Sequence, residues 1–385
     1  AVVQLQADGA ADRGRGGPFG GAGSGSRGFG GTGRRAASDF VPGAGDDRVT
    51  AGPRPRGTLV QRARVAGLEV ASWVACRVPE RILVGVAGVA GWAWYRLAPA
   101  RAAQARRNLA RVVAVIDERG GPRATPRIRA AARDPRALER LVLAAFRHDV
   151  RYYLEVLRVP GLTPAIFERR VVVETPDTVE AAFAGGPVIF VSAHLGPIEL
   201  PGLYLANRSG RTFVAPMETI DDPPLQHWFE RTRGSLGVRI LGLREARRGL
   251  VAALRAGEPV GIVADRDIAG GGMEVPLFGH PAPLPIGPAL VAIEGEAPLY
   301  AVGVRRLADG RVGGRLLPVP VASEGTRRER IAATLASMAA AFEDLISDAP
   351  EQWSAVFFPI WPDLAAPEPE TAPEPEAAPE PEAAP

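Results

Sequence analysis

From about residue 170, the sequence alternates short β-branched runs with stretches of helical periodicity, and this alternation constrains the fold most strongly. Strands and helices in alternation predict an α/β fold with a mostly parallel central sheet covered by helices. Functional sites in such folds form at the carboxyl ends of the strands. The predicted strands are 188–191, 212–214, 238–241, 260–263 and 299–302, and the predicted helices are 197–206, 223–235, 245–256, 286–296 and 326–347, preceded by a long helix at 136–158 that Pro160 ends.

The two ends of the 385-residue chain differ from its centre. Residues 1–57 hold 16 of the 45 glycines and show no hydrophobic periodicity, so we expect a disordered Gly/Arg-rich head. Residues 364–385 repeat Pro-Glu units without a basic residue, and we expect a disordered Pro/Glu-rich tail. The head also lacks the apolar core of a secretory signal, so we expect no export by that route.

The most apolar part of the chain lies early, in two runs at 67–78 and 82–95. Neither run reaches the roughly 18–20 residues needed to span a bilayer. Tryptophans occur in both runs and arginines flank them, which predicts a pair of helices lying on an anionic membrane surface. A helical hairpin packed on the core gives the same pattern, so both interpretations stay open. We expect a variable, Arg-rich link to follow at about 117–135.

Several kinds of chemistry are excluded by what the sequence lacks. The chain contains no lysine, which excludes a Schiff-base or P-loop lysine. Its one cysteine, Cys76, excludes a disulfide framework and fits a reducing compartment. The serine-hydrolase elbow, the zincin motif and the strand-linked dinucleotide motif are also missing from the sequence. We therefore expect no metal or redox cofactor.

His194 directly follows a strongly apolar predicted strand, where this fold class places functional groups. Glu199 comes five residues later, after a Gly196-Pro197 turn, and Pro197 suits the first turn of a helix. The two side chains could act as a general base and the carboxylate that supports its imidazolium form. This spacing arises easily by chance among four histidines and 43 acidic residues, so a purely structural pair stays open.

A second polar cluster, Asp265-Arg266-Asp267, follows the predicted strand 260–263. Three adjacent charges are unusual in a core, and they lie at the carboxyl end of a strand. We therefore predict that this cluster lines a binding site. A solvated turn that leads into a hairpin is the alternative.

Three blocks occur in the chain in a characteristic order: HLGPIEL from residue 194, ADRDIAGGGMEVPLFGH from residue 264 and APEQWSAVFFPIWPDL from residue 349. They resemble the bacterial lipid A lauroyl/myristoyl acyltransferase superfamily. Together with VRYYLEVLRVP and ARRNLARV, they are most similar to the phosphatidylinositol mannoside acyltransferases within it. Glu199 stands where the mannoside enzymes typically have Asp and the lipid A branch has Glu.

The resemblance implies an O-acyltransferase on the cytoplasmic face of the cell membrane, bound in a peripheral or monotopic manner. It would move a long acyl chain from acyl-CoA or acyl-carrier protein to a hydroxyl of a glycolipid acceptor such as a phosphatidylinositol mannoside. The resemblance runs with gaps from about residue 65 to 363, and we expect residues 58–110 to form the membrane-associated helices and residues 111–363 the acyltransferase domain. We expect no nucleic-acid partner.

By the same likeness, His194 is the base and Glu199 its partner, and the hydroxyl attacks the thioester directly. We expect the oxyanion to be bound by backbone N–H groups near Gly196 or by Arg233, and the acyl chain to occupy an apolar groove between the sheet and its helices. A non-catalytic lipid-binding protein, a lipid hydrolase, and a lysophospholipid or lipid A-like acyltransferase stay open as alternatives. Glu218 and Arg233 match the mannoside enzymes by spacing, and a surface pair is the alternative for these two residues. Together with the second polar cluster, the expected substrate-binding residues are Glu218, Arg233, Asp265, Arg266 and Asp267.

Overall fold

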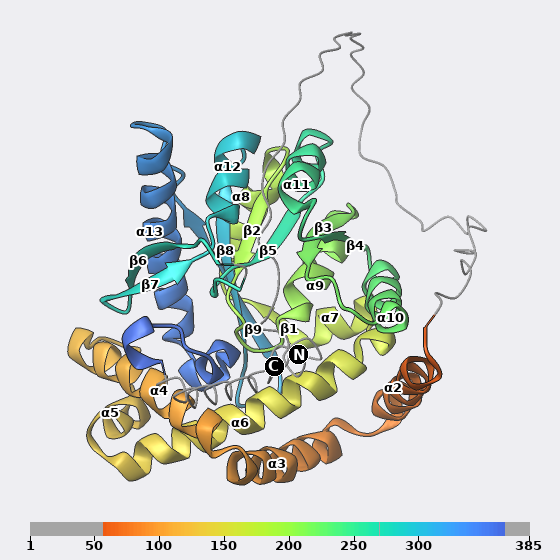
Figure 1. Ribbon diagram of the computed structural model, residues 1–385, viewed down its shortest axis with the longest axis vertical. Helices are drawn as coiled ribbons and strands as arrows, with labels where there is room; N and C mark the ends of the chain where they lie inside the picture. The colour runs from red at the N-terminus through yellow and green to blue at the C-terminus, as the bar shows by residue number, and fades with distance from the viewer. Residues whose placement is uncertain (1–56, 269, 366–385) are drawn as a thin grey trace, which may run out of the picture.

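The computed structural model describes residues 57–268 and 270–365, and nearly all of the predicted head and tail lies outside these ranges. The described residues form an α/β fold around a seven-stranded sheet with the strand order β1-β9-β8-β2-β5-β3-β4 (Figure 1). Neighbouring strands are parallel throughout this sheet except for β8 and β9, which are antiparallel. This arrangement confirms the predicted fold class and its mostly parallel sheet.

All five predicted strands are present in the sheet. Two further strands, β1 and β9, were not predicted, because β1 has only three residues and glycines interrupt the apolar pattern of β9. The strands of the sheet are β1 (Val171–Val173), β2 (Ile189–Ser192), β3 (Phe213–Met217), β4 (Val238–Gly242), β5 (Val260–Val263), β8 (Leu299–Arg306) and β9 (Val312–Val319), and a separate hairpin pairs β6 (Met273–Leu277) with β7 (His280–Leu284).

The helices after β2, β3, β4, β7 and β9 begin and end close to the predicted positions. The Arg-rich link expected at about 117–135 contains a short helix that was not predicted, which starts at Pro126 and is capped by the Thr125 side chain. The helices are α2 (Leu59–Arg77), α3 (Glu80–Leu97), α4 (Pro99–Arg119), α5 (Pro126–Arg133), α6 (Pro135–Leu157), α7 (Pro164–Arg170), α8 (Pro176–Ala184), α9 (Glu199–Ser209), α10 (Pro223–Gly234), α11 (Ala246–Arg255), α12 (Gly287–Gly295) and α13 (Arg327–Ile346).

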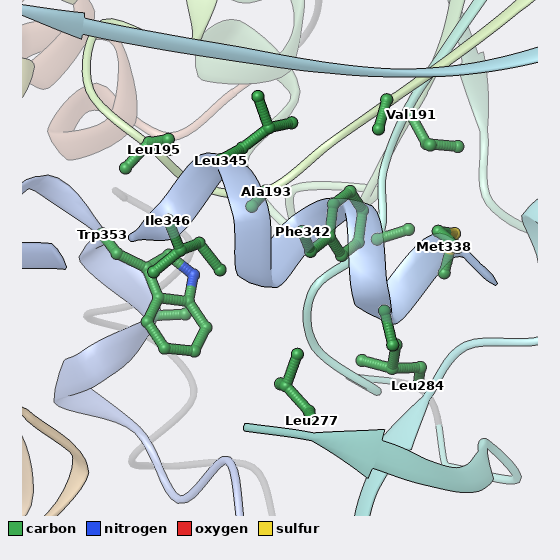
Figure 2. Close-up of a cluster of buried hydrophobic side chains, with 14 of the residues drawn as sticks. Val191, Ala193, Leu195, Leu277, Leu284, Met338, Phe342, Leu345, Ile346 and Trp353 are labelled. Atoms are coloured by element: carbon green, nitrogen blue, oxygen red, sulfur yellow. The ribbon is translucent and has the colours of Figure 1, made fainter. Parts of the chain in front are cut away.

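The main core lies between the sheet and α13. Figure 2 shows Val191, Ala193 and Leu195 facing this helix, whose Phe342 is fully buried. Side chains alternate along a strand, so Phe190 faces the other way and belongs to a second core cluster. His194 continues the same alternation, which directs it away from the α13 side.

Helices α4 and α6 lie against the carboxyl edge of the sheet, and Figure 1 shows them with α3 gathered at one end of the molecule. Glu155 of α6 holds Arg306 at the end of β8, with Oε2 and Nη2 2.6 Å apart. Leu109 and Val112 of α4 are fully buried in the main core. The domain boundary expected at residue 110 therefore falls inside a helix that packs into the core.

Helix α3 packs closely on α6. A Cβ atom on Gly91 would lie 2.6 Å from the Cα atom of Arg147, so glycine is what permits this approach of the two backbones. Helix α2 is tied to the end of α6 by the Ser72 hydroxyl, which donates to the Leu157 carbonyl at 2.6 Å. One face of each helix thus packs on the rest of the molecule, as the second interpretation expects, but the two helices lie one after the other along α6 rather than side by side as a hairpin (Figure 1).

The other face of α2 and α3 is apolar and exposed. Within residues 57–268 and 270–365, no helix combines the length and the hydropathy that a membrane crossing requires. Most of the large exposed apolar side chains of the described chain nevertheless lie on these two helices. They include Val70, Trp73, Val74, Ile82, Val86, Val89 and Trp92.

Candidate active site

The candidate site is built from the ends of two adjacent parallel strands. β2 and β5 pair with Ser192 opposite Val263, so the residues two positions further along, His194 and Asp265, emerge side by side. The Nδ1 atom of His194 lies 2.6 Å from Oδ1 of Asp265. The other carboxylate oxygen accepts the backbone N–H of His194 at 2.9 Å and the indole N–H of Trp353 at 2.6 Å.

The Asp265 carboxyl is 1% exposed, and burial by itself would raise its pKa. The charge of His194 and the three hydrogen bonds outweigh burial and lower the pKa below its usual range. An ionised carboxylate can only accept, so in the neutral form of the imidazole the proton lies on Nδ1 and the lone pair of Nε2 can take a proton. The His194 side chain is 28% exposed, which lets a substrate reach it.

The loop that carries His194 is clamped by residues from the end of the chain. Ser354 donates its N–H to the His194 carbonyl at 2.8 Å, and Gly196 donates to the Gln352 carbonyl at 2.9 Å. Gly196 has a φ of 61°, and a Cβ atom there would lie 2.3 Å from the Val304 carbonyl oxygen. Of the N–H groups expected to bind the oxyanion near this turn, that of Gly196 is therefore excluded, because it already donates to Gln352.

The prediction that Glu199 contacts the imidazole of His194 was wrong. Asp265, from the neighbouring strand, occupies the Nδ1 side of the ring. Glu199 starts α9 and binds Arg233 of α10 through two hydrogen bonds, of 2.6 and 2.9 Å. Burial would raise the pKa of this carboxyl, but the charge and hydrogen bonds of Arg233 lower it. Tyr152 of α6 also faces Glu199, at 3.5 Å.

The remaining predicted site residues have separate environments. Glu218 follows β3, the strand on the other side of β5, and its charge acts on Arg266. The Arg266 guanidinium lies over the ring of Phe358, with Cζ 3.5 Å from the ring centre. Asp267 accepts the N–H of Gly272 at 2.6 Å, so its carboxylate holds the following turn. Asp265 therefore supports His194, whereas a substrate-binding role had been predicted for it.

Sequence reasoning missed two residues of this site. Trp353 is fully buried and donates to Asp265, and Tyr152 lies beside the ion pair that Glu199 makes with Arg233. Both residues lie in blocks that carry the family resemblance, VRYYLEVLRVP and APEQWSAVFFPIWPDL. That location was the only signal available, because nothing local in the sequence brings residue 353 to the end of β5.

A small apolar hollow lies beside α9, between this helix and strands β1, β8 and β9. Leu200, Tyr204, Val302 and Val304 are among its lining residues. A second hollow of about 390 Å³ lies between α12 and the start of β8, at the opposite edge of the sheet from His194. Across the described ranges, no three side chains of His, Cys, Asp or Glu converge as a metal site would require.

Comparisons with known proteins place these residues in a family context. The family described as bacterial lipid A biosynthesis acyltransferase matches residues 61–358. A phosphatidylinositol mannoside acyltransferase of Mycobacterium tuberculosis is 31% identical over 254 residues, covering 64% of this chain and 74% of the relative. The enzyme of that name from Mycolicibacterium smegmatis is 30% identical over 289 residues, covering 74% of this chain and 87% of the relative. These matches confirm the resemblance found in the sequence.

Proposed function

Because the chain belongs to the bacterial lipid A biosynthesis acyltransferase family, we propose that it moves a long acyl chain from an acyl thioester to a hydroxyl of a glycolipid. The thioester is acyl-CoA or acyl-carrier protein. The relatives named phosphatidylinositol mannoside acyltransferases favour an acceptor of that type. The observation that carries the proposal is the His194–Asp265 pair at the carboxyl edge of the sheet, with Nδ1 bound to the carboxylate.

In the proposed mechanism, Nε2 of His194 takes the proton of the acceptor hydroxyl while the oxygen attacks the thioester carbonyl. Asp265 keeps the proton on Nδ1 and stabilises the imidazolium that forms. The tetrahedral intermediate then collapses, the carbon–sulfur bond breaks, and the thiolate takes up the proton held by Nε2. The imidazole returns to its starting state, and no covalent acyl-enzyme is formed.

Glu199 and Arg233 have a positioning role in this mechanism. Their ion pair joins the start of α9, five residues after His194, to α10. Both side chains are largely buried, at 16% and 18% exposure, so the pair is well shielded from solvent. It therefore fixes the turn that follows His194.

The acyl chain needs an apolar space that reaches the thioester carbon. The hollow beside α9 is lined by Leu200 and Tyr204, which follow Glu199 within two turns of the same helix. We place the first part of the acyl chain there, between α9 and strands β1, β8 and β9. The rest of the chain would require α9 to move outward, or would extend toward the exposed apolar face of α2 and α3.

The exposed face of α2 and α3 supports binding to the membrane that holds the acceptor. Trp73 and Trp92 are about half exposed, and the guanidinium groups of Arg77 and Arg96 lie over their rings. Tryptophan and arginine together favour the headgroup region of an anionic bilayer. Acyl thioesters are cytoplasmic substrates, so the proposed reaction takes place at the cytoplasmic face.

Thiol release from palmitoyl-CoA by the purified protein, with and without phosphatidylinositol mannosides, tests the proposal. We expect release that requires the lipid and that is lost in His194→Ala. Fatty acid release without an acylated lipid would instead indicate a hydrolase. Binding of acyl-CoA without turnover on any lipid would indicate a lipid-binding protein.

Flotation with anionic vesicles tests the membrane surface separately. The double variant Val70→Asp with Val89→Asp changes two exposed side chains, so we expect it to fold and to remain unbound. With detergent-dispersed acceptor it should keep its turnover. Vesicle binding equal to that of the wild type would contradict this part of the proposal.

A further inference from the structure

Two arginines converge on one aromatic ring beside the candidate site. Arg266 directly follows Asp265, and its Cζ atom lies 3.5 Å from the centre of the Phe358 ring. Arg101, in the first turn of α4, lies over the same ring at 4.9 Å. The charge of Arg101 acts on Arg266, so positive charge gathers beside the ring.

The carboxylates next to Arg266 are engaged elsewhere. The two oxygens of Asp265 bind His194 and Trp353, and Asp267 binds the N–H of Gly272. Among the residues that the structure describes, no carboxylate lies within ion-pair distance of the Arg266 guanidinium. Glu218 acts on it only from further away.

The surroundings of Arg266 disfavour its positive charge. Burial lowers the pKa of this guanidinium and the charge of Arg101 lowers it further, against the opposing effects of Asp265 and Glu218. A bound anion next to Arg266 would offset this cost of holding its charge. Stacking on Phe358 leaves the N–H edges of the Arg266 guanidinium available for a bidentate contact.

The N-terminus of α4 adds to the positive electrostatic potential around Arg266. Its N-cap residue, Ala98, makes no side-chain hydrogen bond, and its first turn contains no acidic residue. The positive end of the helix dipole lies there as well. Arg101 itself lies in this turn.

We propose that Arg266, stacked on Phe358 and close to Arg101, binds a phosphate group of a substrate that reacts at His194. This inference rests on the proposed function and adds what that part of the site recognises. A phosphate ester is common to both expected substrates, because CoA and the phosphopantetheine of a carrier protein contain phosphates and phosphatidylinositol contains a phosphodiester. The chemistry is the same in either case, and kinetics can tell the two sources apart.

The first test measures kcat and the KM of each substrate separately in Arg266→Gln. A charge-assisted hydrogen bond to phosphate is worth roughly 1.5–3 kcal/mol, or about 10- to 150-fold in affinity. We expect a rise of that size in one KM, with a smaller change in kcat and partial recovery in Arg266→Lys. A raised KM for palmitoyl-CoA identifies the donor phosphate, and a raised KM for the glycolipid identifies the acceptor phosphodiester.

A matched control is Arg311→Gln, since Arg311 is exposed and has its own partner, Asp309, in the turn between β8 and β9. This variant should leave both KM values unchanged. Unchanged KM values in Arg266→Gln, with or without a fall in kcat, would overturn the inference. In that case Arg266 would act only through the position of Asp265.

The second test needs no turnover, so it separates the failure of this inference from the failure of the proposed function. The full-length protein is titrated with CoA against pantetheine, and with dispersed phosphatidylinositol against the corresponding diacylglycerol. We expect tighter binding of the phosphorylated member of one pair, and loss of that preference in Arg266→Gln. Equal binding within both pairs overturns the phosphate site, even for a protein that transfers acyl chains.

Discussion

The variant Asp265→Asn tests how the imidazole of His194 is held. Two N–H donors, from the His194 backbone and the Trp353 indole, converge on Oδ2 of Asp265. In the variant, the side-chain oxygen of the asparagine can still accept from the His194 backbone N–H and the Trp353 indole N–H. Its NH₂ group then faces Nδ1 of His194. The amide then donates to Nδ1, and the imidazole proton moves to Nε2. That is the nitrogen that must accept the proton of the substrate, so the base is disabled.

The size of the effect follows from the step that is lost. General-base catalysis contributes about 10²–10⁴-fold, so kcat should fall by roughly this factor. Neither KM should change by more than about threefold, since Asp265 is 1% exposed and does not reach the substrate. The variant keeps both N–H partners of Oδ2 and removes a buried charge, so we expect a loss of stability of at most about 2 kcal/mol.

The assay is the initial rate of lipid-dependent thiol release, with circular dichroism to verify the fold. The matched control is Glu343→Gln, which removes another buried carboxylate, on α13, without touching the site. It should lower the melting temperature and leave kcat within about threefold of the wild type. A folded Asp265→Asn protein with kcat within threefold of the wild type would refute the tautomer assignment.

Three further variants give sharp predictions. Gly196→Ala places a Cβ atom 2.3 Å from the Val304 carbonyl oxygen at a left-handed φ, so we expect about 2–4 kcal/mol of destabilisation and loss of turnover, read by thermal denaturation and initial rates. Trp353→Phe removes the indole donor to Asp265 and should lower kcat about tenfold or more; an unchanged rate would show that this bond does not position the carboxylate. Burial lowers the pKa of His148 in the folded protein to about 3. Below about pH 6.5 this histidine is therefore protonated in the unfolded chain but not in the folded one. The free energy of unfolding should fall as the pH is lowered from about 6.5 to 3, by up to about 1.4 kcal/mol per pH unit. Urea unfolding across this range should show a shallower pH dependence in His148→Gln, and an equal slope in both proteins would contradict the assignment.

Much of the sheet could be predicted from the sequence, because strands buried on both faces appear as short apolar runs. The run at 188–191 is the clearest example, since all four residues of β2 are buried, and the run at 260–263 became its neighbour β5 in the sheet. The order of the strands could not be predicted, since the pairing of β2 with β5 joins residues 71 positions apart. β1 and β9 were missed because three residues, or a run broken by two glycines, give no clear periodicity.

The same limit explains why the partner of His194 was predicted wrongly. His194 and Asp265 were each found at the end of a strand, but the sequence does not show that these two strands are adjacent. The nearer carboxylate, Glu199, was therefore paired with His194, whereas the register of β2 and β5 brings Asp265 there. Trp353 reaches the site only because the segment after α13 crosses back over the end of β2. Contacts of this kind depend on the complete topology.

The central claim is that this chain transfers an acyl group to a glycolipid with His194 as the base. The most direct measurement follows radiolabelled palmitate from palmitoyl-CoA into the lipid fraction, on vesicles that contain phosphatidylinositol mannosides. It compares the wild type, His194→Gln and, as a matched control, the exposed His280→Gln on the β6–β7 hairpin. We expect labelled glycolipid from the wild type and from His280→Gln, and none above background from His194→Gln. Equal labelling by all three proteins, or label that appears only as free palmitate, would contradict the account.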